Sequence, residues 1–231
     1  VQQDPADQVV TDKVWHELAF GLESLGLPSP VIRRQVAETA AYFGISSWFD
    51  QRVDTLSGGQ MQLLNLAAVM CMQPTLLLLD EPTAQLDPIA AEQFLATLAR
   101  LNRELGTTIL LAEQRLESAL PLCTRVCVLD GGQLLCQGTP QEAGLALRTQ
   151  QHRMFQAMPV PMRVWSAVPN DAPCPVTVGE GRAWLAALPT PPKPIPPDPV
   201  PAHGAPLLSL REVWFRYHPE DPDILRGLSL T

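Results

Sequence analysis

A serine and two glycines, Ser57, Gly58 and Gly59, lie directly before a helical stretch and have the types and spacing to bind an anion. The helical pattern continues through residues 60–72 (QMQLLNLAAVMCM). The first amides of a helix have no partner within it, they lie at the positive end of its dipole, and glycine does not block close approach. The segment therefore predicts an anion-binding loop, although a glycine pair before a helix is also typical of an ordinary turn.

Two adjacent acids, Asp80 and Glu81, end an apolar run at residues 75–80 (TLLLLD). Such a run predicts a strand buried on both faces of a parallel sheet, and ligands of these sheets bind at the carboxyl ends of the strands. Because neighbouring strand residues point to opposite sides, one acid can hold Mg²⁺ while the other orients an attacking water. A lone Asp-Glu pair in a solvated turn is the alternative.

Three motifs in this order, LSGGQ (56–60), LLLLDEPT (76–83) and Leu86-Asp87-Pro88, resemble the signature, Walker B and D-loop motifs of ABC ATPases. The resemblance implies that Asp80 serves Mg²⁺, that Glu81 polarises the hydrolytic water, and that Asp87 communicates across a dimer of ABC domains. It also implies ATP and Mg²⁺ as cofactors. The γ-phosphate of an ATP held on the opposite domain would be covered by the signature residues, Ser57, Gly58, Gly59 and Gln60.

Two segments near the N-terminus extend the resemblance. Gln3 matches the Q-loop glutamine, which in this family senses Mg²⁺ and the attacking water and touches the transmembrane partner. Residues 14–23 (VWHELAFGLE) look like the start of the helical subdomain in energy-coupling-factor and cobalt-type importers, which take up vitamins or transition-metal ions. Trp15 and His16 suggest stacking or metal binding, but packing or an interface is the favoured interpretation for residues at the start of a helix.

The segment LAEQRL (111–116) is similar to the switch region of the family, which usually has histidine where this sequence has Gln114. Glutamine can donate a hydrogen bond but cannot carry a positive charge or relay a proton. Either hydrolysis at this site is impaired, or Gln114 is a tolerated variant with reduced but useful turnover.

The sequence has no GxxxxGK[ST] phosphate-binding loop, the Walker A motif of the family. We expect one loop upstream of Val1 and a second roughly ten residues after Thr231, so that both ends of the chain are cut. By itself the chain is then not expected to hydrolyse ATP. Tyr217 stands where the family has an aromatic that stacks on adenine, with Trp214 and Phe215 beside it, and simple strand packing is the alternative.

Alternating helix and strand patterns predict an α/β fold. The resemblance implies that residues 1–150 form a P-loop NTPase-like ABC ATPase domain, with a mostly parallel sheet and a helical subdomain. Residues 151–188 are expected to form a small appendage of uncertain fold. Half of residues 189–206 are proline, which predicts a semi-rigid linker. Residues 207–231 are expected to be the first strands of a second ABC domain.

Local signals place the element ends. Gly44 should stop a helix over residues 30–43, and Asp87 with Pro88 should start one that Gly106 closes. Residues 107–113 should form a strand, 115–122 a short helix, and 125–130 a strand that pairs with 133–136 across Gly131-Gly132. Capping boxes at residues 139–142 and 177–180 should open two more helices.

Composition excludes several classes of protein. The formal net charge of −8 offers no attraction to a phosphate backbone, so nucleic acid is not an expected partner. The five cysteines form no CxxC pair, which favours reduced thiols over a metal site. No apolar run approaches the ~20 residues of a membrane span, which predicts a chain without a transmembrane segment. The resemblance implies a peripheral protein at the cytoplasmic face of the membrane.

The resemblance implies an ATP-binding, ATP-hydrolysing subunit that energises a membrane transporter. Its expected partners are transmembrane subunits and a second ABC domain, either in the same chain or in a dimer. The alternative is a soluble ABC ATPase of the translation-factor or DNA-repair type. Linkers in that class tend to be long charged helices or coiled coils, whereas this one is proline-rich and the chain is acidic.

Overall fold

The computed structural model describes residues 5–188 and 208–230, so Gln3 and the proline-rich segment lie outside the described residues. The chain divides into two compact units, at residues 1–188 and 189–231. The first unit holds two hydrophobic cores, and the second holds a single strand pair.

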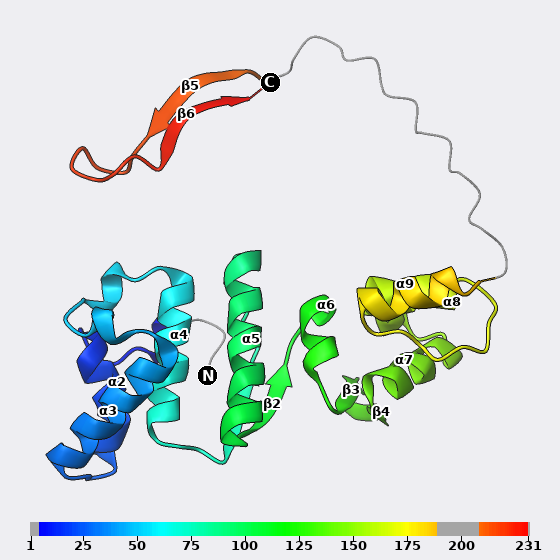
Figure 1. Ribbon diagram of the computed structural model, residues 1–231, viewed down its shortest axis with the longest axis horizontal. Helices are drawn as coiled ribbons and strands as arrows, with labels where there is room; N and C mark the ends of the chain where they lie inside the picture. Colours follow the sequence, from blue (N-terminus) through cyan, green and yellow to red (C-terminus); the bar gives the residue numbers. More distant parts are fainter. Residues whose placement is uncertain (1–4, 189–207, 231) are drawn as a thin grey trace. The chain divides into compact units, whose positions relative to one another are not determined.

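The first core is built by helices that pack side by side (Figure 1). They are α1 (Pro5–Gln8), α2 (Val14–Ser24), α3 (Ser29–Phe43), α4 (Gly58–Cys71) and α5 (Pro88–Leu105), with 3₁₀ turns at Ser46–Trp48 and Val53–Thr55. Helix α3 ends at Gly44, whose φ of 71° is the left-handed conformation that glycine adopts without strain. Leu18, Val36, Leu64 and Leu66 are completely buried between the helices.

One parallel strand pair follows, β1 (Leu76–Asp80) and β2 (Thr108–Ala112), in the register Leu76↔Thr108 to Asp80↔Ala112. The expectation that β1 is buried on both faces is wrong for the described structure. Leu77 and Leu79 are buried, but Leu76 is 52% and Leu78 is 56% exposed. A single covered face suffices to bury alternate residues of a strand, and an unbroken apolar run does not reveal how many faces are covered.

Helix α5 shows how local signals set the ends of an element. The Asp87 carboxylate accepts hydrogen bonds from the amides of Ile89 and Ala90, both at 2.9 Å, and Pro88 is the first helical residue. Gly106 ends the helix with φ 68°. The predicted limits of this helix are confirmed.

The second core joins a hairpin to three helices. The chain continues through α6 (Leu116–Ala119) and a 3₁₀ turn (Leu120–Leu122) to the antiparallel pair β3 (Val126–Asp130) and β4 (Gln133–Gly138), as the Gly-Gly turn predicts. Helices α7 (Pro140–Thr149) and α9 (Val178–Ala186) begin with the two predicted capping boxes. Between them lie a 3₁₀ turn (Arg153–Ala157) and α8 (Val160–Ser166). The predicted domain boundary near residue 150 stays a prediction. Residues before and after this position contribute to the same core.

Polar contacts also hold the second core together. The Arg153 guanidinium and His152 both pair with the Asp130 carboxylate at 3.1 Å, and Arg153 in the first place lowers the pKa of Asp130. The Arg148 guanidinium lies 4.3 Å from the centre of a Trp165 ring, a cation–π contact. Burial raises the pKa of the Cys174 thiol to about 11, so this cysteine is protonated and inert at neutral pH.

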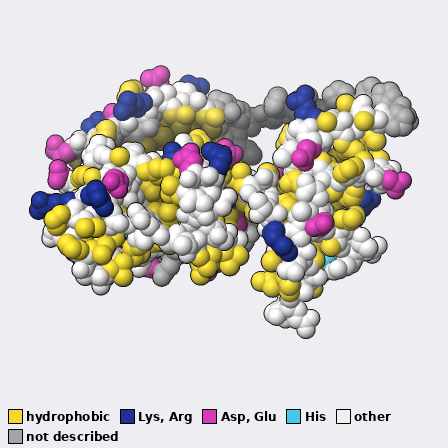
Figure 2. Space-filling view, turned by 60° about the horizontal axis from the view of Figure 1, so that its bottom comes forward, with side chains coloured by type: hydrophobic (Ala, Val, Ile, Leu, Met, Phe, Trp, Pro, Cys, Tyr) yellow, Lys and Arg dark blue, Asp and Glu magenta, His cyan; other side chains and the backbone are white. Residues whose placement is uncertain are grey.

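The second unit contains the antiparallel pair β5 (Leu210–Phe215) and β6 (Leu225–Leu230). That these strands open a second ABC domain stays a prediction. Hydrophobic side chains reach the surface at many points of the face in Figure 2. Among the helices that the structure describes, none is long and apolar enough to span a membrane.

Two glycines of α9 form a matched pair for testing how tightly α8 and α9 pack. A Cβ at residue 181 would lie 3.0 Å from Pro161 Cβ, whereas at residue 179 the nearest atom is Thr177 Oγ1 at 3.9 Å. Gly179→Ala should therefore stabilise the protein by up to roughly 1 kcal/mol through helix propensity. Gly181→Ala should lose this gain or destabilise, because the Pro161 ring has to move. Urea unfolding followed by tryptophan fluorescence measures both; equal shifts would contradict the close packing.

Candidate functional site

The signature residues form the N-terminus of α4, as predicted. Ser57 Oγ accepts from the Gln60 amide at 3.3 Å, and Gln60 Oε1 accepts from the Ser57 amide at 2.9 Å, which is a capping box. The amides of Gly58 and Gly59 take no part in this box. A Cβ at Gly58 would meet no atom within 4 Å, so the start of the helix is open on that side. This geometry suits an anion that receives backbone N–H groups.

The signature also contacts the start of α5. A Cβ at Gly59 would lie only 3.1 Å from Ala90 Cβ, so a glycine here lets the two helix starts approach closely. Asp87, predicted to communicate across a dimer, uses its carboxylate in this structure to cap α5. The proposed role across a dimer stays a prediction.

The two predicted acids lie at the carboxyl end of β1. Asp80 is the last residue of the strand and is exposed, and Glu81 is half-buried. The Glu81 amide extends the parallel pairing by donating to the Ala112 carbonyl at 2.9 Å. Glu81 has a φ of 42°, a left-handed conformation that is strained for a residue with a Cβ. Such strain is typical of sites where function requires one orientation of the side chain.

Gln114 meets Glu81 across the ends of the two strands. Its Nε2 donates a short hydrogen bond to Glu81 Oε1, although 33 residues separate the two. The predicted catalytic carboxylate and the predicted switch residue are therefore brought together. A neutral donor at this position can orient the carboxylate but supplies no positive charge.

Three further residues stabilise the site, and the sequence reasoning missed them. Thr83 Oγ1 donates to Glu113 Oε2 at 2.7 Å, and Glu113 Oε1 accepts from the amides of Gln114 and Arg115. Arg115 Nη1 donates to the Leu86 carbonyl at 3.1 Å. Their positions in the sequence could have indicated them. Thr83 follows the two acids closely, and Glu113 and Arg115 flank Gln114.

Other predicted residues do not join this cluster. Trp15 packs edge-on against Phe49 with ring centres 5.6 Å apart, and His16 pairs with Asp12 at the surface, which fits packing roles. Tyr217 belongs to the second unit, where it is 73% exposed and contacts Phe215 edge-on. Stacking of Tyr217 on adenine and the Q-loop role of Gln3 stay predictions.

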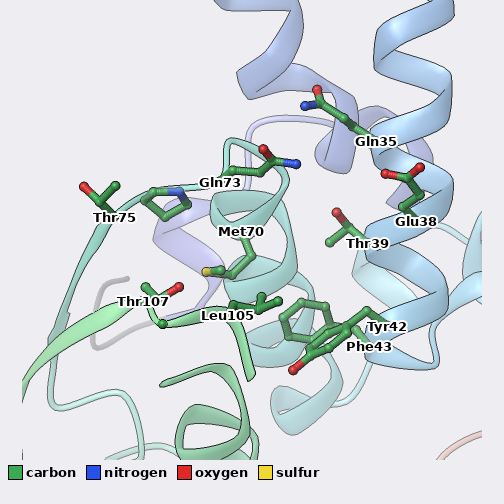
Figure 3. A pocket seen from close by; sticks show the side chains of 12 residues that line it. Gln35, Glu38, Thr39, Tyr42, Phe43, Met70, Gln73, Thr75, Leu105 and Thr107 are labelled. Atoms are coloured by element: carbon green, nitrogen blue, oxygen red, sulfur yellow. The ribbon is translucent and has the colours of Figure 1, made fainter. Parts of the chain in front are cut away.

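A cavity of about 430 Å³ lies away from these residues (Figure 3). Side chains of α3, including Gln35, Thr39 and Tyr42, face Met70 and Gln73 at the C-terminal end of α4. The signature is at the other end of this 14-residue helix, roughly 20 Å away at 1.5 Å per residue. The cavity contains none of the predicted site residues.

The described residues fit a magnesium nucleotide but not a metal cage of protein ligands alone. No group of three or more His, Cys, Asp or Glu side chains that could hold a metal ion occurs within 5–188 or 208–230. Asp80 offers one exposed carboxylate at the strand end. Mg²⁺ typically binds through one or two carboxylates together with substrate phosphates and water, so a single acid here suits it.

Comparison with known proteins agrees with the fold. Residues 2–84 match the model of the ABC transporter family. The solved structure of cbiO1 from Clostridium perfringens, part of the ABC transporter complex cbiONQ, superposes with a TM-score of 0.59 at 33% identity, covering 65% of this chain and 61% of that one. The chain therefore has the ABC ATPase fold, an α/β P-loop NTPase fold.

Two relatives show which ABC proteins the chain is similar to. It is 42% identical, over its whole length, to a protein of Bacillus thuringiensis subsp. konkukian that is named as an ABC transporter ATP-binding protein. The energy-coupling factor transporter ATP-binding protein EcfA1 of Symbiobacterium thermophilum is 42% identical over 142 residues, 62% of this chain and 49% of the relative. The chain is thus similar to ABC transporter ATP-binding proteins, and it spans 42% of the length of the Bacillus relative.

Replacing Gln114 by histidine tests the role of the switch residue. In the complete protein, Gln114→His should raise ATP turnover by roughly tenfold, because an imidazole can carry charge and relay a proton; a fully positioned acid or base contributes ~100-fold or more. Steady-state phosphate release measures the effect, and Gln85→His, at an exposed position of the turn before Asp87, is the control. Unchanged turnover in Gln114→His would show that glutamine already serves the site fully.

Proposed function

We propose that the complete protein carrying this chain binds and hydrolyses ATP to energise a membrane transporter. The observation that carries the proposal is the hydrogen bond from Gln114 to Glu81, which joins the carboxyl ends of two parallel strands. Ligands of parallel sheets bind at this edge. A carboxylate oriented there can polarise a water for attack on a phosphate, which is the arrangement that phosphoryl-transfer sites use.

Each site residue then has a defined task. Asp80 would hold Mg²⁺, which neutralises negative charge on the phosphates when it is bound. Glu81 orients and polarises the attacking water, and Gln114 holds the Glu81 carboxylate. The amides of Gly58 and Gly59 donate to the γ-phosphate of an ATP on an opposite ABC domain. In this proposal, two domains share each ATP. Sharing explains why the signature lies at an open helix end.

Coupling to transport follows from that shared nucleotide. Binding of two ATP closes a pair of ABC domains, closure moves a transmembrane partner, and hydrolysis resets the pair. The second domain would come from the same chain, for which β5 and β6 would be the opening strands, or from a dimer. The cbiO1 structure supports a transmembrane partner, since that protein is part of an ABC transporter complex.

We further propose that the transporter is an importer of the energy-coupling-factor type. The similarity to EcfA1 and to cbiO1 supports this branch, and its cargo would be a vitamin or a transition-metal ion. The protein would then lie at the cytoplasmic face of the membrane. Recognition of the cargo would be a task of a membrane subunit.

Removing the charge of Glu81 tests the catalytic assignment. Glu81→Gln in the complete protein should lower ATP hydrolysis by about 100-fold or more, because an amide is a poor acceptor for the proton of the attacking water. ATP binding should remain, as measured by equilibrium titration with a fluorescent nucleotide. Glu23→Gln, at an exposed position of α2, is the matched control and should hydrolyse ATP normally. Full hydrolysis in Glu81→Gln would refute the assignment.

Purification from detergent-solubilised membranes tests the transport assignment. The complete tagged protein should carry with it a multi-spanning membrane protein, and its ATP hydrolysis should rise in that complex. Ribosomes or DNA-repair factors in place of a membrane protein would instead support the soluble class of ABC ATPases.

A further inference from the structure

Helix α4 buries two amide side chains that the proposed function has not yet used. Gln62 is completely buried and Asn65 is 1% exposed, and the two lie three residues apart on one side of the helix. Their buried neighbours on α4 are apolar, among them Leu64, Leu66 and Ala67. Burying an amide costs free energy unless it is hydrogen-bonded, so the partners of these two side chains are informative.

Both amides donate to backbone carbonyls beside the predicted catalytic segments. Gln62 Nε2 donates to the Pro82 carbonyl at 2.8 Å, and Pro82 directly follows Glu81. Asn65 Nδ2 donates to the Pro5 carbonyl at 2.8 Å, and Pro5 lies two residues after Gln3 in the sequence. One side of a single helix is thus bonded to the Walker B turn and to the peptide that follows the expected Q-loop.

The same helix begins with the signature. Gln62 lies four residues after Gly58 and three after Gly59, so it is on the turn directly beyond the anion-binding amides. An α-helix of 14 residues packed in a core moves as a rigid element. A small shift of the signature is therefore transmitted to Pro82, and from there to the strained backbone of Glu81.

We propose that Gln62 and Asn65 are positioning residues that couple the signature to hydrolysis. They keep Glu81 and the segment after Gln3 in register with the N-terminus of α4. When the signature engages ATP on the opposite domain, the bond from Gln62 to Pro82 sets the Glu81 carboxylate to orient the attacking water at its own site. The bond from Asn65 to Pro5 holds the segment after Gln3 against the same helix. This inference rests on the proposed ATPase function and adds to it a physical link between the two nucleotide sites of a domain pair.

The link between α4 and the segments it bonds can be tested by substitutions. These keep the volume of the side chain but remove its hydrogen-bond donor. In the complete protein with its membrane partner, Gln62→Met and Asn65→Leu should each lower kcat for ATP hydrolysis about tenfold, since a misplacement of about 1 Å can cost up to ~100-fold. KM for ATP should change less than about twofold, because the residues do not touch the nucleotide. Asn102→Leu, which removes an amide-to-carbonyl bond to Thr107 far from the site, is the control and should leave kcat unchanged.

A conservative variant separates positioning from mere stability. In Gln62→Glu the protonated carboxyl can still donate to the Pro82 carbonyl, whereas the ionised form cannot, and burial raises the pKa of a carboxyl. The kcat of Gln62→Glu relative to the unmodified protein should therefore be near normal at acidic pH and fall as the pH rises. A lower melting temperature alone would not produce this profile.

The outcomes distinguish the coupling role of Gln62 and Asn65 from the ATPase function. If the unmodified protein hydrolyses ATP and the variants retain its kcat per folded molecule, the coupling role is refuted while the ATPase function stands. A fall in kcat that is absent at low pH for Gln62→Glu supports the coupling role. If the unmodified complex hydrolyses no ATP, the proposed function fails and the coupling role fails with it.

Discussion

The packing of α4 is the constraint on which the first unit depends. Its buried residues contact α1, α2, α3 and α5, so neighbouring helices fix its position from several sides. Side chains packed at the density of a protein interior leave such a helix little freedom to deform or to shift independently of the elements packed against it. Because Gly58 and Gly59 lie at the N-terminus of this helix, the hydrophobic core itself determines where their amides lie. The site is thus positioned from within the core and not by a surface loop.

The candidate site at the strand ends is held differently, by polar contacts at the carboxyl ends of two short strands. The strained backbone of Glu81 is held by pairing to Ala112, and its carboxylate is held by Gln114. Glu113 organises the turn next to it by bonding Thr83 and two backbone amides. Because several hydrogen bonds act within one cluster, the orientation of each side chain depends on its neighbours. Loss of one partner therefore affects the others. The hydrophobic core thus fixes the position of α4, and the polar network orients the Glu81 carboxylate.

Most element limits could be predicted because their causes are local. Gly44 and Gly106 end helices through a left-handed backbone, and Asp87 starts one by capping amides two and three residues away. The burial of β1 could not be predicted in the same way. Leu76 and Leu78 have the same apolar character as Leu77 and Leu79, yet they are exposed. Exposure depends on which elements cover a face, and that information is not contained in the strand's own residues.

By itself the sequence determined the motifs and their order and predicted a class of chemistry, because residue type and spacing within a few positions specify helix starts, turns and acidic strand ends. Only the tertiary structure decided which of these residues act together. The pairs Gln114–Glu81, Gln62–Pro82 and Asn65–Pro5 are separated by 33, 20 and 60 residues. Each contact exists because the packing of α4 and the pairing of β1 with β2 bring distant segments within hydrogen-bonding distance, and no local pattern encodes such a distance.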